Sequence, residues 1–258
     1  MRRFALVFLA ASFLFTSACQ AAQDAGPAHA PDYRAQQFLF ALYFGPKPNA
    51  PFTATAKTTW VKIMPDNSTI TTWNERIVAH DMDGRIFQER RFLVPNDGKQ
   101  QPQLRLYVYT DPLQHTSYTC TPNAKTCDMN NYFPPQIDPL APEGLQPDGI
   151  TWLTRENLGV DTYEGLDVQR SRETFTYFNQ TIANTKTILR VVDYWYSPVL
   201  GVNVKVVRHD PRDGDQTLWL TNISLTAADP ELFQVPADYQ VFDRRTPKPV
   251  IRPQAPEQ

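Results

Sequence analysis

The sequence lacks the short motifs that mark the common enzyme classes. It contains no Gly-x-Ser-x-Gly, Walker A, His-Glu-x-x-His or Ser-x-x-Lys sequence. Hydrolase and phosphotransferase interpretations therefore have no motif to support them. We expect a protein that is not an enzyme and that needs no cofactor.

Neither positive nor negative charge is in large excess. The formal net charge is −2 over 258 residues, and no run of five or more basic residues occurs. This excludes a general electrostatic attraction to nucleic acid. Outside the first residues, basic side chains are adjacent only at Arg90-Arg91 and Arg244-Arg245, and we predict that both are solvated surface pairs.

Histidine is rare, with four residues in the chain. Two of them, His80 and His209, precede aspartates in glycine-containing segments, which is a pattern that could suggest metal ligands. However, adjacent residues in a strand point to opposite faces, and aspartates in turns are explained by hydrogen bonds to their own backbone. We therefore expect no metal site.

There are three cysteines. Cys120 and Cys127 flank a segment whose Pro-Asn pair is typical of a turn, so a disulfide that closes a hairpin is the simplest interpretation. A zinc site would need paired Cys-x-x-Cys or Cys/His spacing, which is missing here. Such a bond suits an oxidising compartment.

A long hydrophobic run is absent as well. Arg2 and Arg3 precede a segment from Phe4 to Phe15 that is apolar except for Ser12. It is too short to span a bilayer, which requires roughly 20 apolar residues. The pattern is typical of a secretory signal peptide over residues 1–22. We expect an exported protein.

Cys19 has no partner among the remaining cysteines and directly follows the apolar run. It resembles the lipid-attachment cysteine of bacterial lipoproteins, although Thr16 stands where their motif usually has Leu. Lipidation would anchor the protein to a membrane through its acyl chains, and Gln20 would, by that resemblance, favour the outer membrane. Alternatively, cleavage after Ala21 or Ala22 removes Cys19 with the signal peptide.

Alternating and β-branched residues dominate the rest of the chain. We predict one antiparallel β domain over residues 23–246 and a disordered proline-rich tail over 247–258. Apolar residues at helical spacing predict a helix over Pro31–Tyr43. We expect about ten strands. Their predicted ranges are 52–64, 68–80, 85–94, 104–110, 116–119, 150–158, 166–177, 187–196, 202–209 and 217–225.

Prolines interrupt this pattern between Phe133 and Gly149. Proline cannot donate to a strand ladder, so the segment cannot supply central strands. It is predicted to be an extended loop that either covers a site or lies over the core.

Aromatic residues make up 12% of the chain and are the candidates for contacts with an apolar ligand. The weak candidates are Trp60, Trp73, Trp195 and Trp219, with Trp152 as a further member of the set. All five are equally explained as large core residues of a β protein.

The last third of the chain carries a resemblance. Tyr194-Trp-Tyr-Ser-Pro198, a valine-rich strand, Asp210-Pro-Arg-Asp-Gly214 and Pro230-Glu-Leu-Phe-Gln-Val-Pro236 follow one another. This order resembles the closing part of bacterial envelope proteins related to the lipoprotein carrier LolA and the sensor RseB. The resemblance implies a curved antiparallel sheet, an unclosed half-barrel, with a helix across its concave face. Because an unclosed sheet must cover that face, we expect the helix Pro31–Tyr43 and the proline-rich loop to cover it.

Two hypotheses follow. The first, implied by the resemblance, is an envelope protein in the periplasm or outer membrane of a Gram-negative bacterium that binds a lipid, a lipoprotein acyl chain or another apolar ligand in the concave face. The second is a structural or protein-interaction module of the envelope without a small ligand.

Overall fold

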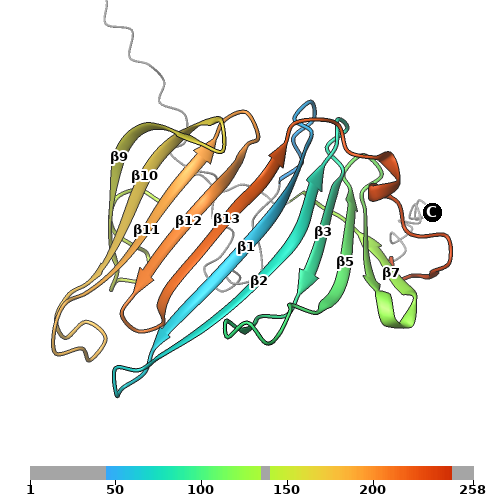
Figure 1. Cartoon of the computed structure of the whole chain (residues 1–258). Helices are drawn as coiled ribbons and strands as arrows, with labels where there is room; N and C mark the ends of the chain where they lie inside the picture. The colour runs from blue at the N-terminus through green and yellow to red at the C-terminus, as the bar shows by residue number, and fades with distance from the viewer. Residues whose placement is uncertain (1–44, 135–139, 246–258) are drawn as a thin grey trace, which may run out of the picture.

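The computed structural model describes residues 45–134 and 140–245, and these residues form one curved β-sheet (Figure 1). Every recorded strand pair is antiparallel except β14 with β7, which is parallel. The elements are β1 (Phe52–Ile63), β2 (Thr69–His80), β3 (Ile86–Arg91), β4 (Val94–Pro95), β5 (Leu104–Asp111), β6 (Thr116–Thr121), η1 (Pro122–Ala124), β7 (Thr126–Asn131), β8 (Gly144–Leu145), β9 (Trp152–Tyr163), β10 (Leu166–Tyr177), β11 (Ile188–Ser197), β12 (Val202–Asp210), β13 (Gly214–Ser224), η2 (Pro230–Phe233) and β14 (Gln240–Asp243).

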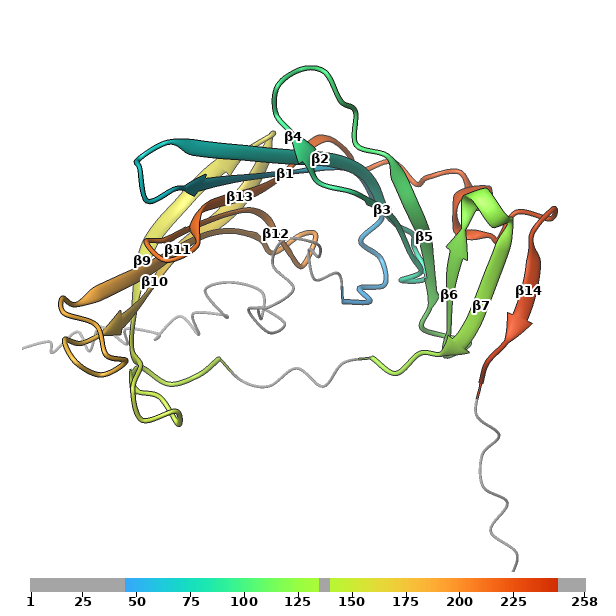
Figure 2. The ribbon, with the colours of Figure 1, turned by 90° about the horizontal axis from the view of Figure 1, so that it is seen from below.

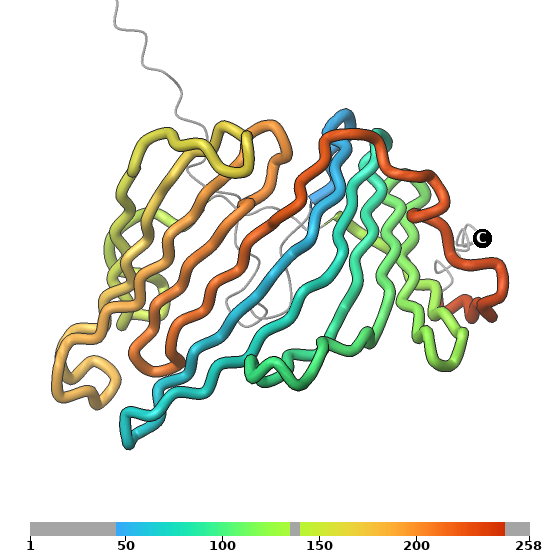
Figure 3. Tube along the Cα trace, viewed as in Figure 1, coloured from blue at the N-terminus to red at the C-terminus, as the bar shows by residue number. Residues whose placement is uncertain are grey.

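The sheet consists of two meanders that meet in its middle. The first contains β1, β2, β3, β5, β6 and β7, and the second contains β8 to β13. They are joined by the pairing of β1 with β13, in which Ala56 lies opposite Leu220. Figure 3 shows these two strands side by side at the centre, so residues far apart in the sequence form the central contact.

The sheet bends into an arch and does not close. Its edges are β14 and β8, which lie at opposite ends of the strand order. Seen from below, both ends of the sheet bend toward the same side (Figure 2). The described parts of the predicted proline-rich loop, next to β7 and before β9, lie on that open side.

Apolar side chains pack on both faces of the sheet. Val78 and Ile86 belong to a cluster on the concave face, whereas their chain neighbours Ala79 and Phe87 belong to a second cluster on the convex face. Alternation along a strand explains this division, because successive side chains point to opposite faces. The second cluster includes Phe233 of η2, so the C-terminal segment covers part of the convex face.

The predicted disulfide is confirmed. Cys120 and Cys127 are bonded and lie directly opposite each other in the β6–β7 ladder. Both are buried in the convex cluster. The bond therefore joins two neighbouring strands of the sheet at a tight turn formed by η1.

All ten predicted strands are present, but the strand over 85–94 was predicted too long, and the strand over 150–158 was predicted too short, since β9 continues to Tyr163. The expected strand over 85–94 ends at Arg91, and Val94 then pairs with Trp73 of β2 in the separate strand β4. The predicted loop contains the two-residue edge strand β8. The predicted helix Pro31–Tyr43 and tail 247–258 lie outside the described residues. Within the described part of the chain, no helix is long and apolar enough to cross a membrane.

Candidate functional site

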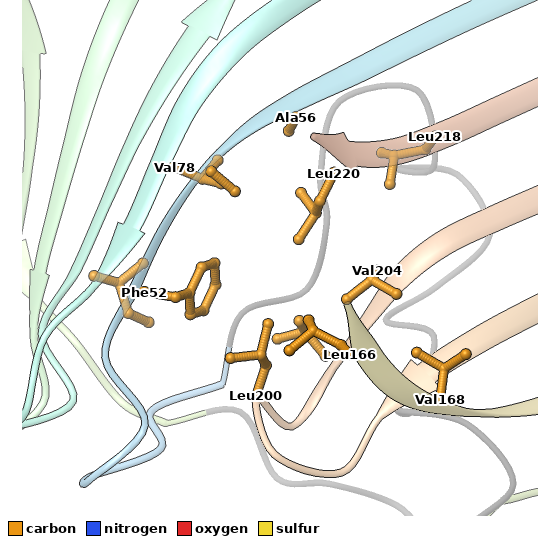
Figure 4. Close-up of a cluster of buried hydrophobic side chains, with 12 residues drawn as sticks. Phe52, Ala56, Val78, Leu166, Val168, Leu200, Val204, Leu218 and Leu220 are labelled. Carbon is orange, nitrogen blue, oxygen red and sulfur yellow. The ribbon is translucent and has the colours of Figure 1, made fainter. Parts of the chain in front are cut away.

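The concave face carries the main apolar cluster of the molecule. Figure 4 shows side chains from both meanders pointing toward one another within the bend of the sheet. β1, β2 and β3 supply one part, and β10, β12, β13 and the turn at Leu200 supply the other. The members are Phe52, Ala54, Ala56, Val78, Ile86, Leu166, Val168, Leu200, Val202, Val204, Leu218 and Leu220. The hollow side of the sheet is therefore apolar along its centre.

Bulges account for the bend on the β9 side of the sheet. The ladder of β9 with β10 shifts register between Arg170 and Ser171, and that of β11 with β12 shifts between Trp195 and Tyr196. Arg170 lies opposite Trp195, so both irregularities fall on one line across the strands. Because a bulge adds local twist and bending, this line turns β9 and β10 toward the hollow.

Further along β2 and β12, the concave face carries polar and charged side chains instead of apolar ones. Asn74 and Arg76 precede Val78 at alternate positions of β2, and all three are buried. On β12, Arg208 and Asp210 likewise follow the buried Val206. The concave face thus changes from apolar to charged within one strand length.

Asp210 is the best-compensated of these buried charges. Its side chain is fully buried and accepts hydrogen bonds from Arg212 Nε (2.9 Å) and Nη2 (2.8 Å) and from Arg208 Nη2 (3.3 Å). Burial raises the pKa of this carboxyl, but the hydrogen bonds from the two arginines outweigh it and hold the pKa at about 2. Asp210 also accepts from the Arg212 backbone N–H, as expected for a turn aspartate.

A second compensated group lies on β10. Glu173 accepts from Arg155 Nε at 3.0 Å and from the hydroxyl of Tyr194 at 3.3 Å. Arg155 Nη2 also donates to the carbonyl of Ala141 in the proline-rich segment at 3.2 Å. This network ties the described end of that loop to the sheet.

Arg76 differs from both groups because no acidic side chain of the described residues pairs with it. It is 2% exposed, and its Nη1 donates to Thr58 Oγ1 (3.1 Å) and to Asn74 Oδ1 (3.2 Å). Burial lowers its pKa, and the neighbouring charge of Arg90 lowers it further, to about 10. The charge of Arg76 is therefore held in an unfavourable setting.

The predicted surface pair Arg90-Arg91 was wrong for Arg90. Adjacent strand residues point to opposite faces. Arg91 pairs with Glu89 on the convex face, whereas Arg90 is partly buried on the concave face, where its pKa is lowered by burial. The signal that could have found it is the alternation in β3, since Arg90 shares a face with the apolar Ile86. The second pair, Arg244-Arg245, is exposed.

The four tryptophan candidates are not brought together. Trp60 follows Thr58 at an alternate position on the concave face, and its Nε1 donates to the Asp213 carbonyl at 2.7 Å. Trp219 lies between the buried Leu218 and Leu220, and so points to the convex face.

Trp73 also lies on the convex face, opposite Val94 of β4. Trp195 lies at the line of bulges, with Arg170 and Lys205 over its ring at 4.8 and 4.6 Å from the centroid. Trp195 is partly buried and packs against the concave cluster. Trp60 and Trp195 are therefore the candidates that adjoin the hollow.

The histidines that precede aspartates have structural roles. His80 is buried; its Nε2 accepts from the Lys47 backbone N–H at 3.1 Å and its Nδ1 lies 3.2 Å from the Ala50 carbonyl. The exposed His209 pairs with Asp215. No group of three potential metal ligands occurs within residues 45–134 and 140–245.

Taken together, these features define a mainly β protein with one unclosed, mostly antiparallel sheet and an apolar concave face. No protein-family model and no curated protein matches the chain. Among solved structures, it is similar to MucB in the MucA/MucB complex of Pseudomonas aeruginosa, with 14% identity, a TM-score of 0.37, and coverage of 74% of this chain and 58% of that one.

Two further solved structures are also similar to the chain at low sequence identity. A LolA superfamily protein from Nitrosomonas europaea is 8% identical, with a TM-score of 0.29 and coverage of 73% of this chain and 91% of that one. The lipoprotein LppX from Mycobacterium tuberculosis is 10% identical, with a TM-score of 0.29 and coverage of 70% and 89%. These similarities include a protein of the LolA superfamily, to which the sequence shows a resemblance, at low identity.

Proposed function

We propose that this chain is a non-catalytic bacterial envelope protein that holds an apolar chain, either of a lipid or of an acylated lipoprotein, against the concave face of its sheet. The observation that carries the proposal is the cluster of buried apolar side chains inside the bend, to which both meanders contribute. A hollow with apolar lining and a few polar groups at one end is the usual form of a site for an amphiphile.

We also propose where in the cell the protein is located. An exported chain would form the Cys120–Cys127 bond in an oxidising compartment, and cytosolic proteins rarely keep such bonds. The segment over residues 1–22 would direct the export, and Cys19 would carry a lipid anchor if it is retained. We place the protein in the periplasm or at the outer membrane of a Gram-negative bacterium.

The alternative is an interaction module of the envelope that uses the sheet as a platform. It is favoured by the contacts of the concave side chains with one another, since a cluster that fills its own space leaves no room for a ligand. The proposed function requires that an acyl chain can insert between Phe52, Val78 and Leu220, whereas in the alternative these side chains stay in contact with one another.

Photolabelling tests the proposal. The full chain is incubated with a diazirine-bearing fatty acid, illuminated and digested, and the labelled peptides are identified by mass spectrometry. We expect labels in β1 and β13 around Ala56 and Leu220, and competition by excess unlabelled palmitate. Labels restricted to exposed apolar residues of the outer surface, such as Phe92 and Leu113, would contradict it.

A further inference from the structure

Arg76 lies at the border of the apolar cluster. It stands opposite Ala56 of β1 and two positions before Val78 on β2, and both of these residues belong to the cluster. Ala56 in turn lies opposite Leu220. A ligand chain that packs on these side chains would therefore end beside the guanidinium group of Arg76.

One edge of that guanidinium group has no hydrogen-bond partner among residues 45–134 and 140–245. The Nη1 atom is held by Thr58 and Asn74, whereas Nε and Nη2 are buried and donate to no acceptor in this part of the chain. Buried polar groups of proteins are nearly always paired, and an unpaired buried charge is especially unfavourable. The bonds to Thr58 and Asn74 fix the side chain without neutralising it.

The same edge binds carboxylates elsewhere in this molecule. Nε and Nη2 of Arg212 donate to the two oxygens of Asp210, and Nε and Nη2 of Arg172 donate to those of Asp193. Two parallel donors of this kind match the oxygens of a carboxylate or a phosphate. Arg76 therefore presents the anion-binding edge in a buried position.

Two other arginines of the concave face differ from Arg76, although Nε of each is also buried without an acceptor in the described part of the chain. Arg208 pairs with Asp210, and the guanidinium of Arg190 lies 3.8 Å from the ring centroid of Phe175. Arg76 instead lies near Arg90, a charge of the same sign that lowers the pKa of Arg76. Continuing the β2–β3 register by one alternate step from the Val78–Gln88 pair places Arg90 across from Arg76.

We propose that Arg76, beside the like charge of Arg90, binds the phosphate or carboxylate group of an amphiphile whose apolar chain packs on the concave cluster. This inference rests on the proposed function and adds the chemical class of the ligand's head group. A bound anion would accept from Nε and Nη2 of Arg76 and neutralise its charge.

Binding of two matched probes tests the inference. Oleoyl lysophosphatidate and mono-oleoylglycerol share an acyl chain and a glycerol group, and differ in the phosphate. Their affinities are measured by isothermal titration with the full-length wild type, with Arg76→Met and with Arg105→Met. Arg105 is an exposed arginine of β5 with its guanidinium over Phe92, so it serves as a control for the loss of one positive charge.

We expect the wild type and Arg105→Met to bind lysophosphatidate about tenfold or more tightly than mono-oleoylglycerol, because bonds to charged groups are strong. Arg76→Met should lose this preference and keep its affinity for mono-oleoylglycerol. A thermal unfolding scan shows that each variant is folded; Arg76→Met should unfold at a higher temperature than the wild type in the absence of ligand, since it removes a buried unpaired charge.

The contrary outcomes separate the two proposals. If both probes bind equally to the wild type, or if Arg76→Met keeps the preference, the head-group inference is wrong and the proposed function stands. If neither probe binds to the folded wild type, the proposed function itself fails. Inorganic phosphate that binds as tightly as lysophosphatidate would identify a site for a free anion and overturn the assignment to an amphiphile.

Discussion

Ala56 and Leu220 lie directly opposite each other, 164 positions apart in the sequence, and both are completely buried. Their pairing joins the first long strand of the described chain to the last long one. The two meanders would otherwise be separate sheets, each with an exposed edge. The central contact of the concave face therefore depends on the chain's longest-range strand pair, which also makes this face a sensitive place to test the fold.

Leu220→Ala should lower the free energy of unfolding by about 2 to 5 kcal/mol, because it removes buried apolar atoms and leaves a cavity among side chains from several strands. The measurement is urea denaturation followed by tryptophan fluorescence. Leu113 is 69% exposed, and Leu113→Ala serves as the matched control with an expected change within about 0.5 kcal/mol. Equal effects of the two substitutions would contradict the assignment of the core.

Gly214 permits the close approach of the β12–β13 hairpin to β1. Its φ is +89°, and a Cβ there would lie 2.1 Å from the carbonyl oxygen of Val61. Gly214→Ala should therefore destabilise the protein by more than about 3 kcal/mol, through backbone strain combined with a steric clash.

Gly98→Ala is the control for this substitution. The φ of Gly98 is +74°, but no atom lies within 4 Å of the added Cβ. The expected loss is the strain alone, about 1 to 2 kcal/mol. If the denaturation midpoints of Gly214→Ala and Gly98→Ala coincide, the approach of Gly214 to Val61 is not tight.

His80 should make stability depend on pH. Burial lowers its pKa in the folded protein, and its two nitrogens are positioned to accept from Lys47 and to donate to Ala50 as a neutral ring. The unfolded chain binds a proton near the ordinary value of about 6.5. The stabilisation is therefore complete above about pH 6.5 and is lost as the pH falls below it.

Urea denaturation at a series of pH values between about 5 and 8 checks this expectation. His80→Asn should reduce the stability and flatten its decline toward low pH. His115 is exposed and has a φ of +53°, which asparagine tolerates, so His115→Asn should retain the wild-type slope. An unchanged slope in His80→Asn would assign the titration to other groups.

The disulfide should contribute about 2 to 3 kcal/mol to stability, since it closes a short loop between two buried cysteines. The double variant Cys120→Ala/Cys127→Ala should lose this amount, and a reducing agent should bring the wild type to the same level. The variant itself should not respond to the reductant. Wild-type stability that is unaffected by complete reduction would contradict a stabilising role.

Most strands could be predicted because their signals are local. Short-range turns such as Pro65-Asp66-Asn67 separate runs with period-two alternation, and these positions agree with the ends of β1 and β2. The junction of β1 with β13 carries no such signal, because pairing between distant strands depends on the whole sheet. The break after Arg91 was missed for a related reason: Val94 leaves β3 to pair with β2, which alternation alone does not reveal.

The candidate site was predictable only in part. Aromatic content suggested Trp219 and Trp73, but alternation places both on the convex face. The same rule applied to β2 would have placed Arg76 with Val78 and His80 on one buried face. What the sequence could not supply is the absence of an acid beside Arg76 among the described residues, since that depends on which distant strands meet there.

We propose above all that the concave face holds the apolar chain of an anionic amphiphile. Native mass spectrometry of the mature protein, purified from its own envelope under mild conditions, tests it most directly. A spectrum under denaturing conditions separates a non-covalent ligand from an acyl anchor at Cys19. We expect a bound lipid with an acidic head group that is released on denaturation; a folded protein with the mass of the polypeptide and any covalent anchor alone would contradict this expectation.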